Sequence, residues 1–464
     1  MIKIVNITDY FFRNIDNNLK ENDKYETIEE YLNKKYLEIL FHLNIPKEDI
    51  LLQTIFLKCT NNRDYFFQKE KIIRKMFELF TTKENESDEG DVMPPISIVS
   101  QTPINVEQNV DHIFGMEIMF VNDHFKNNFL PTIVRKKIKV NNNDDVIYYC
   151  ILEYNNNNYE DNQEIKNKQL FIGGLNPVTI HFCDNNYDNI HQCYTEVFEQ
   201  LNKIFEIEEF TFSDIVRQWN YIENIHGFTM DVNQNYQIFN EIRSQFYAKD
   251  DENFQHYGYP AATGIGTHAG ILNIDLIAIK KTEDILICPL KNFLQTDAHQ
   301  YDREVLILPA SHYYNDKNQC FKKYNTPKFE RGKLVCFKNS EFIIFVSGTA
   351  SIQNQESLFI NDIEKQFITI QENINFLVSN ENINHHLLQL DDKKCIQINE
   401  DIPLLFDDLN YLRIYIKREF DIPLVIKNLN HYLKKQCNDH KKIIFLIADI
   451  CRPELLIEME GYLK

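Results

Sequence analysis

The chain of 464 residues has no apolar run that reaches the roughly 18 residues needed to cross a bilayer. Its opening stretch, MIKIVNITDYFFRNIDNN, also lacks the basic, apolar and small-residue regions of a secretory signal. We therefore expect a cytoplasmic protein that has no membrane partner.

Basic charge is scarce. Lys and Arg number 49 against 69 Asp and Glu, which gives a formal net charge of −20. Nucleic acids and anionic membranes both attract basic surfaces, so neither is expected as the main partner. The acidity is then the charge of a solvated surface.

Metal-binding and nucleotide-binding motifs are missing as well. The 10 cysteines include no CxxC pair and no Cys/His pair at zinc-finger spacing, so neither a disulfide framework nor a metal site is predicted. The glycine-rich stretch GIGTHAG, residues 264–270, matches neither phosphate-binding pattern. We expect reduced cysteines and no nucleotide cofactor.

Hydrophobic residues make up 43% of the chain and aromatic residues 13%, which is enough to fill real cores. After residue 93 the periodicity predicts strand, strand, helix, strand, helix, strand, and this order occurs twice. The predicted fold is mixed α/β, with a mainly helical N-terminal extension (1–93) and two similar units (94–255 and 256–464). Because the two units can form a cleft within one chain, we expect a monomer.

Two groups of unusual residues fall on predicted elements of the first unit. Arg217, Trp219 and Tyr221 alternate along a predicted strand and therefore share one face. Tyr236 and Arg243 share a face of the following helix. The helical pair fits a binding surface and, equally well, a polar helix face with an incidental arginine.

The stretch SGTASIQNQES, residues 347–357, follows the apolar run EFIIFV directly. Its small residues let a chain turn tightly and expose hydroxyl and backbone N–H groups, and Glu356 comes near its end. One interpretation is a binding loop with a catalytic carboxylate. The other is a strand-to-helix loop in which Glu356 is favoured by the helix dipole.

Six segments in order resemble the chorismatases, which release pyruvate from chorismate in secondary metabolism. The resemblance begins at about Ile96 and runs to the C-terminus, and these are its segments: RQWNYI with YQIFNEIRSQFY, GYPAATGIG, NFLQTDAHQY, FERGKLV, SGTASIQNQES and ADICRPELLIEMEG. The family is built from two YjgF/RidA-like units, which agrees with the repeated pattern.

The resemblance implies roles for individual residues. Glu356 falls at the family's acid position and Arg331 at its carboxylate-binding arginine, although Asn354 and Gln355 replace the family's Gly-His. The other substrate-binding candidates are Arg243, Tyr236, Tyr221, Ala262, Gly348, Thr349 and Ala350.

The implied reaction needs an acid and two cationic anchors. Protonation of the enolpyruvyl methylene turns chorismate into an oxocarbenium ion, so the ether breaks and pyruvate leaves. A glutamate with an ordinary pKa near 4.3 would be ionised at neutral pH, so the site must raise that pKa by burial. Arginine forks suit the two carboxylates of the substrate. Neither a metal nor an organic cofactor is required, and the ring product is a hydroxybenzoate or a dihydroxycyclohexadiene carboxylate.

Two alternatives stay open. One is a RidA-like enamine or imine deaminase, in which Arg452 would bind the substrate carboxylate. The other is a catalytically inactive protein of the same fold that binds small acids.

Overall fold

Long apolar runs of the sequence form strands that are buried on both faces. Every residue of β2 (Ile50–Leu57) and of β12 (Leu272–Ile279) is buried, as expected for strands covered on two sides. The computed structural model describes residues 2–6, 28–59, 61–81, 92–105, 110–111, 114–129, 131–140, 146–155, 166–178, 187–229, 233–306, 325–337, 341–390, 406–432 and 443–464.

Sheet 1 contains most of the N-terminal strands. In spatial order it consists of β1 (Ile2–Asn6), β6 (Phe114–Val121), β2 and β3 (Ile96–Val99). The helices α2 (Ile28–His42) and α3 (Asn62–Phe80) share a buried core with it. The prediction of a mainly helical extension was therefore wrong, because the run ILLQTIFL is a buried strand at the centre of a sheet.

Sheet 2 carries the first helix pair that the sequence predicts. Its spatial order is β11 (Ala261–Thr267), β10 (Ile215–Glu223), β12, β9 (Lys166–Leu175), β8 (Val146–Asn155) and β7 (Thr132–Lys139). The helices that pack on one face are α5 (Tyr187–Glu208) and α6 (Asn235–Tyr247), and α7 (Asp251–Tyr257) follows them. The apolar faces of α5 and α6 are buried against this sheet.

Sheet 3 combines strands from both ends of the chain. Its spatial order is β13 (Ile285–Leu290), β14 (Gly332–Phe337), β15 (Phe342–Ala350), β20 (Ile457–Leu463), β18 (Tyr411–Ile416), β19 (Ile443–Ile447), β4 (Thr102–Asn105) and β5 (Val110–Asp111). Its outer face is covered by α9 (Ile363–Val378), α10 (Asn380–Leu387) and α11 (Ile422–Tyr432). Shorter elements are α4 (Asp123–Phe129), α8 (Arg303–Leu306), β16 (Ile352–Gln353) and β17 (Glu356–Ser357).

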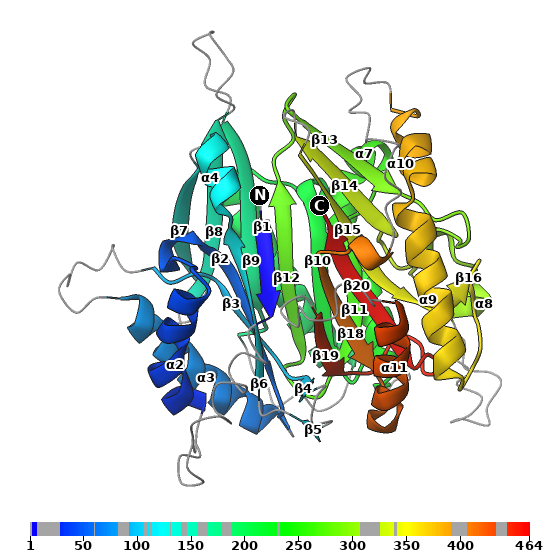
Figure 1. The fold of residues 1–464 in the computed structure, drawn as a ribbon, viewed down its shortest axis with the longest axis horizontal. Coiled ribbons are helices and arrows are strands. Elements are labelled where there is room, and N and C mark those ends of the chain that lie inside the picture. Colours follow the sequence, from blue (N-terminus) through cyan, green and yellow to red (C-terminus); the bar gives the residue numbers. More distant parts are fainter. Residues whose placement is uncertain are drawn as a thin grey trace.

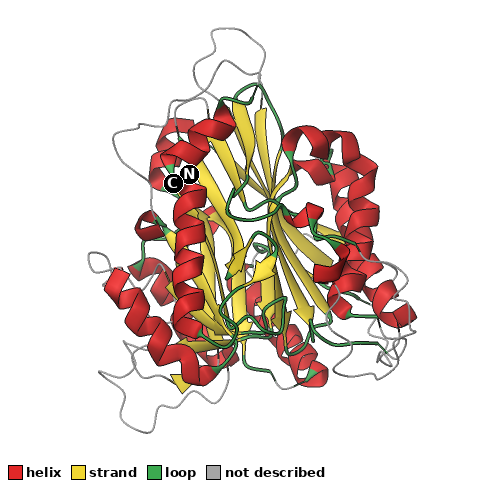
Figure 2. Cartoon of the chain, turned by 90° about the vertical axis from the view of Figure 1, so that its right-hand side faces the viewer, coloured by secondary structure: helices red, strands yellow, loops and turns green. Residues whose placement is uncertain are grey.

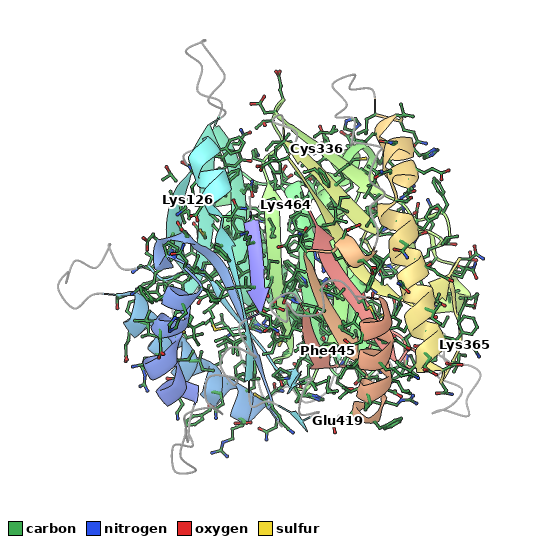
Figure 3. All side chains as sticks on the ribbon, viewed as in Figure 1. Lys126, Cys336, Lys365, Glu419, Phe445 and Lys464 are labelled. Carbon is green, nitrogen blue, oxygen red and sulfur yellow. The ribbon has the colours of Figure 1, made fainter. Side chains whose placement is uncertain are left out.

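Helices lie on the outside and sheets on the inside. Figure 1 shows α9 and α11 on the outer side of sheet 3 and α2 and α3 on the opposite side of the molecule. The turned view in Figure 2 shows the strands enclosed between helices. The inner faces of the three sheets share one hydrophobic core, and side chains fill the space between the ribbons (Figure 3). The protein is therefore a mixed α/β structure, as predicted.

The sheets do not follow the predicted domain limits. β11 and β12 lie beyond residue 255 but belong to sheet 2, whereas β4 belongs to sheet 3. Residues 81–91, 141–145 and 154–168, whose polar composition predicts loops, lie largely outside the described residues. None of the helices in the described ranges is long and apolar enough to cross a membrane.

Two buried arginines tie the three sheets together within their shared core. Arg413 on β18 donates from Nε to both carboxylate oxygens of Glu117 on β6, at 3.0 and 2.9 Å. It also donates from Nη1 to Glu460 on β20, at 3.2 Å, and to the Tyr221 hydroxyl on β10, at 2.8 Å. One guanidinium therefore contacts all three sheets.

Arg217 on β10 makes the second connection. Its Nη2 pairs with Glu460 Oε2 and donates to the Thr263 hydroxyl on β11 at 2.7 Å, while the ring N–H of Trp219 donates to Glu460 Oε1 at 2.9 Å. The prediction that Arg217, Trp219 and Tyr221 share one face of a strand is confirmed, because all three reach this cluster. Burying such ions costs several kcal/mol each, roughly, so only well-satisfied partners make the arrangement stable.

Candidate active site

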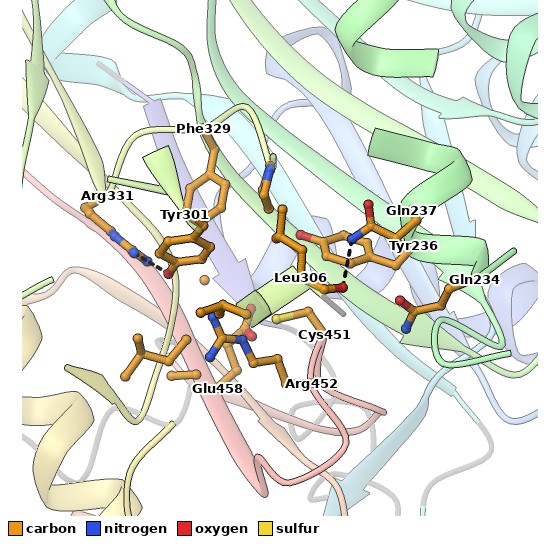
Figure 4. Close-up of a pocket in the computed structure, with 15 residues that line it drawn as sticks. Gln234, Tyr236, Gln237, Tyr301, Leu306, Phe329, Arg331, Cys451, Arg452 and Glu458 are labelled. Atoms are coloured by element: carbon orange, nitrogen blue, oxygen red, sulfur yellow. Dashed lines mark hydrogen bonds between the residues drawn. The ribbon is translucent and has the colours of Figure 1, made fainter. Parts of the chain in front are cut away.

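One pocket, with a cavity volume of about 60 Å³, opens between α6 of sheet 2 and the strands β15 and β20 of sheet 3. The residues that line it are Gln234, Tyr236, Gln237, Tyr301, Val305, Leu306, Pro327, Phe329, Arg331, Gly348, Ala350, Ile352, Cys451, Arg452 and Glu458. Figure 4 shows that the side chains come from both sides of the junction, with the arginines and Glu458 near one another.

Glu458 on β20 supplies the carboxyl group of the pocket. The residue is buried, with 3% of its surface exposed. Burial raises its pKa to about 8, and the charge of Glu460 adds to the increase, although Arg217 and Arg331 oppose it. The carboxyl is therefore mostly protonated at neutral pH, and it can donate a proton.

Gly348 on β15 makes room for this carboxyl. A Cβ atom at position 348 would lie 2.0 Å from Glu458 Oε1 and 2.9 Å from its Cδ. The pairing of β15 with β20 shifts register between Val346 and Thr349, so Gly348 lies in a bulge. Glycine in a strand often marks such a bulge or a close approach. The small residues of SGTAS thus create space for an acid from the neighbouring strand.

Arg331 immediately precedes β14 and lines the pocket. Its Nη2 donates to the Thr296 carbonyl at 2.7 Å and to the Tyr301 hydroxyl at 2.5 Å. Its Nε is buried and has no hydrogen-bond partner among the described residues. Because an unpaired buried N–H is costly, this donor is available for an acceptor that enters the pocket.

Arg452 supplies a second guanidinium on the other side of Tyr301. Its Nη1 donates to the Gln355 carbonyl at 2.9 Å and to the Ser357 hydroxyl at 3.1 Å. Its Nη2 is buried and also lacks a partner within the described part of the chain. The guanidinium carbons of Arg331 and Arg452 lie 5.6 and 5.3 Å from the Tyr301 ring centroid. The pocket thus offers two unsatisfied cationic donors that flank one aromatic ring.

Comparison with known proteins supports a family. Residues 135–278 match the family model described as "Chorismatase FkbO/Hyg5-like, N-terminal". The chain is 26% identical over 273 residues to a 3-hydroxybenzoate synthase of Streptomyces hygroscopicus, which covers 58% of this chain and 67% of that protein. It is 24% identical over 271 residues to a chorismatase of Streptomyces rapamycinicus, with the same two shares.

The chain is thus similar in sequence to the chorismatases. A chorismatase crystal structure also matches it with a TM-score of 0.55 and 18% identity, over 90% of this chain and 94% of that one. At this identity the match shows a chorismatase-like fold. The resemblance inferred from the sequence is confirmed.

Four of the residues predicted to form the site line the pocket: Arg331, Tyr236, Gly348 and Ala350. Glu356 does not. It is exposed on the two-residue strand β17, which pairs with β16. Its neighbours Gln355 and Ser357 hold Arg452, so this hairpin serves the pocket by placing an arginine.

The other predicted residues lie behind the lining. Arg243 is buried and donates to Asn240 Oδ1 at 2.7 Å, and Tyr221 belongs to the cluster around Arg413. The Ala262 N–H donates to the Ser347 hydroxyl at 3.0 Å, and the Thr349 hydroxyl donates to the Ser347 carbonyl at 2.9 Å. None of the four is among the residues that line the described pocket.

Sequence reasoning missed Glu458, Tyr301 and Cys451. Glu458 and Glu460 alternate in the otherwise apolar run LLIEMEGYL, which is the signal of a strand with two inward carboxylates. Cys451 lines the pocket as a neutral thiol, because burial raises its pKa to about 12 and the Glu458 charge acts in the same direction. Tyr301 ends the segment NFLQTDAHQY, which carries part of the resemblance, but nothing in that segment singled out its side chain.

We expect Gly348→Ala to move the Glu458 carboxyl away from the bulge while the fold is retained, because the obstructed atoms end a flexible side chain. As the carboxyl gains water, its pKa should fall from about 8 toward the ordinary range. A crystal structure and an infrared titration of the carboxyl band measure both effects. Ala350→Gly, two residues along the same strand, is the control. An unmoved carboxyl in Gly348→Ala would contradict this account.

Proposed function

We propose that this protein cleaves chorismate and releases pyruvate together with a ring product. The observation that carries the proposal is a buried carboxyl in one pocket with two guanidinium groups that have unsatisfied donors, and burial raises the pKa of that carboxyl to about 8. The names of its relatives, chorismatase and 3-hydroxybenzoate synthase, support the same substrate.

The two arginines fit the charge of chorismate, which carries a ring carboxylate and an enolpyruvyl carboxylate. Each unsatisfied donor, Arg331 Nε and Arg452 Nη2, can donate to one carboxylate oxygen, and guanidinium groups favour bidentate contacts with such groups. Because each arginine is already held by protein acceptors, little ordering is needed when the substrate binds. The aromatic rings of Tyr236, Tyr301 and Phe329 form walls for the ring.

Glu458 is proposed as the general acid. It transfers its proton to the methylene carbon of the enolpyruvyl group, and the C=C electron pair forms the new C–H bond. The resulting oxocarbenium ion then loses the ring, either when water attacks it or when the ring aromatises. The first route consumes one water and gives pyruvate and the dihydroxycyclohexadiene carboxylate. In the second, the C–O bond to the ring breaks and its electron pair stays on the ether oxygen, which becomes the pyruvate carbonyl. The oxygen of the neighbouring ring hydroxyl bonds to the vacated ring carbon, and the ring loses a proton to the Glu458 carboxylate as it aromatises. This route consumes no water and gives pyruvate and a hydroxybenzoate.

We infer that sheets 2 and 3 correspond to two YjgF/RidA-like units. A pair of long helices covers the outer face of each sheet: α5 and α6 on sheet 2, and α9 and α11 on sheet 3. The pocket lies at the junction of the two sheets. A RidA-like deaminase would also use a carboxylate-binding arginine, and Arg452 is placed to serve as one. Pyruvate release from chorismate, followed with lactate dehydrogenase, separates the two activities.

Glu458→Gln should lower kcat for pyruvate release by about 10²–10⁴, with little change in KM, because an amide cannot deliver the proton. Glu356→Gln should keep nearly normal turnover, since Glu356 is exposed on β17. Both variants are compared at one pH, with the thermal midpoint as the control for folding. The reverse pattern, an active Glu458→Gln and an inactive Glu356→Gln, would assign the acid to the hairpin.

The rate should also fall at alkaline pH. Glu458 acts in its protonated form, which predominates below a pKa of about 8. The value of kcat/KM, which reports the free enzyme, should therefore be level near neutrality and fall about tenfold per pH unit above 8. A steady-state profile between pH 6 and 10 measures this. A fall that begins near the ordinary glutamate pKa, or no alkaline fall at all, would exclude Glu458 as the acid.

We propose 3-hydroxybenzoate as the ring product. The route to it needs no water, which suits a pocket with mostly apolar and aromatic lining, and one relative is named for this product. Chromatography of the ring compound formed in a single turnover should show 3-hydroxybenzoate in a 1:1 ratio with pyruvate. Recovery of the dihydrodiol instead would establish the hydrolytic route.

A further inference from the structure

A second buried carboxylate, Glu460, lies two residues beyond Glu458 on β20. Alternate residues of a strand share a face, so both side chains point from sheet 3 toward the interior, roughly 7 Å apart along the strand. Glu460 has only 2% of its surface exposed and does not line the pocket. The proposed mechanism assigns no role to Glu460.

Glu460 is held as an anion by donors from three strands. Its oxygens accept from Arg217, Trp219, Arg413, Tyr415 and the Thr263 hydroxyl. Burial alone would raise its pKa, but the two arginines and the hydrogen bonds from Thr263 and Tyr415 hold the pKa below its usual value. The negative charge at this position is therefore permanent at neutral pH.

A short chain of contacts joins Glu460 to the pocket. The Thr263 hydroxyl donates to Glu460 and accepts from the Gly348 N–H at 3.0 Å. Gly348 is the residue whose missing side chain leaves space for the Glu458 carboxyl. The same hydroxyl thus fixes the anion and the bulge against which the acid rests.

Resting on the proposed function, we propose that Glu460 is a positioning residue of the reaction: through Thr263 it fixes the Gly348 bulge against which the Glu458 carboxyl lies, and its negative charge reinforces the effect of burial on that carboxyl. The arginines of the buried cluster then have a second effect besides joining the sheets. They keep Glu460 charged, and this charge favours the protonated form of Glu458.

The charges around Glu458 come from several elements, and Glu460 is the anion nearest along its own strand. Arg217 on β10 and Arg331 before β14 oppose protonation, whereas Glu460 favours it. The remaining titratable groups near Glu458 or its pocket are Tyr236, Tyr301, Cys451, Arg452 and Glu454. Among the groups that act on Glu458, Glu460 and Arg217 can therefore be altered outside the pocket lining.

The test is a pair of substitutions in the whole chain. Glu460→Gln removes a negative neighbour, so Glu458 should lose its proton at a pH lower by about one unit, and the alkaline limb of kcat/KM should move with it. Glu117→Gln is the matched control, because Glu117 also pairs with Arg413 but is not among the charges that act on Glu458. Glu117→Gln should shift the alkaline limb of kcat/KM by less than half of the shift in Glu460→Gln. An unshifted limb in Glu460→Gln would overturn the proposal.

Arg217→Gln should shift the alkaline limb of kcat/KM in the opposite direction. It removes a cation that opposes protonation of Glu458, so the limb should move to higher pH, whereas damage to the fold alone would lower the rate without this shift. If Glu460→Gln alone yields no folded protein, Arg217→Gln is compared with the double variant Arg217→Gln/Glu460→Gln, which removes both members of the buried pair. The limb should lie at lower pH in the double variant than in Arg217→Gln, and equal limbs would overturn the proposal.

An infrared titration of the carboxyl band, assigned by its loss in Glu458→Gln, follows the proton without turnover. It separates two failures. If the band titrates at the same pH in Glu460→Gln as in the wild type, this inference is overturned while the proposed acid stands. A band that shifts as expected, together with an active Glu458→Gln, keeps the electrostatic link and removes Glu458 from the mechanism.

Discussion

The pairing of Arg413 with Glu117 and Glu460 is the interaction on which the rest of the structure depends. It joins β18, β6 and β20, and through Tyr221 it also reaches β10, so one guanidinium fixes three sheets relative to one another. Apolar side chains alone would allow the sheets to slide, because hydrophobic contact has no direction. Buried ions are costly unless every partner is in place, so this cluster tolerates one strand register and penalises the alternatives. Loss of one partner would leave an uncompensated charge in the core, which typically costs about 3–5 kcal/mol.

The register of β20 also decides which of its side chains point into the pocket. Glu460 is fixed by the cluster, and Glu458 two residues earlier on β20 must then point to the same side, between Gly348 and the guanidinium of Arg331. A slip of one residue would turn both carboxyls to the opposite face, toward α9. The bulge in β15 opposite Glu460 also contributes, because it places Gly348, which has no side chain, next to the Glu458 carboxyl. The single strand β20 therefore carries both Glu460, which helps to join the sheets, and Glu458, the proposed acid.

The sequence predicted the elements whose signals are local. The long amphipathic helices α5, α6 and α9 and the strands β10, β12 and β18 follow from periodicity, and Arg331 and Gly348, which the sequence proposed as substrate-binding residues, line the pocket. The acid could not be found this way. Gly348 and Glu458 are 110 residues apart, and only the pairing of β15 with β20 shows that they touch. The N-terminal region was misread for a related reason: β2 becomes a strand through partners at residues 96–99 and 114–121, which no local pattern reveals.

Substrate charge completes the electrostatics of the proposed site. In the free protein Arg331 opposes protonation of Glu458, and it does so with an incompletely satisfied guanidinium. A bound carboxylate would neutralise that cation, so its opposing effect would weaken when the dianion arrives. The acid would then hold its proton more firmly in the complex than in the free protein, until the methylene carbon accepts it. Because the opposing arginine lies in the pocket and the supporting anion lies behind it, binding removes the first influence and leaves the second intact. An acid buried in a merely apolar pocket would lack this response, since nothing there could be neutralised by the substrate.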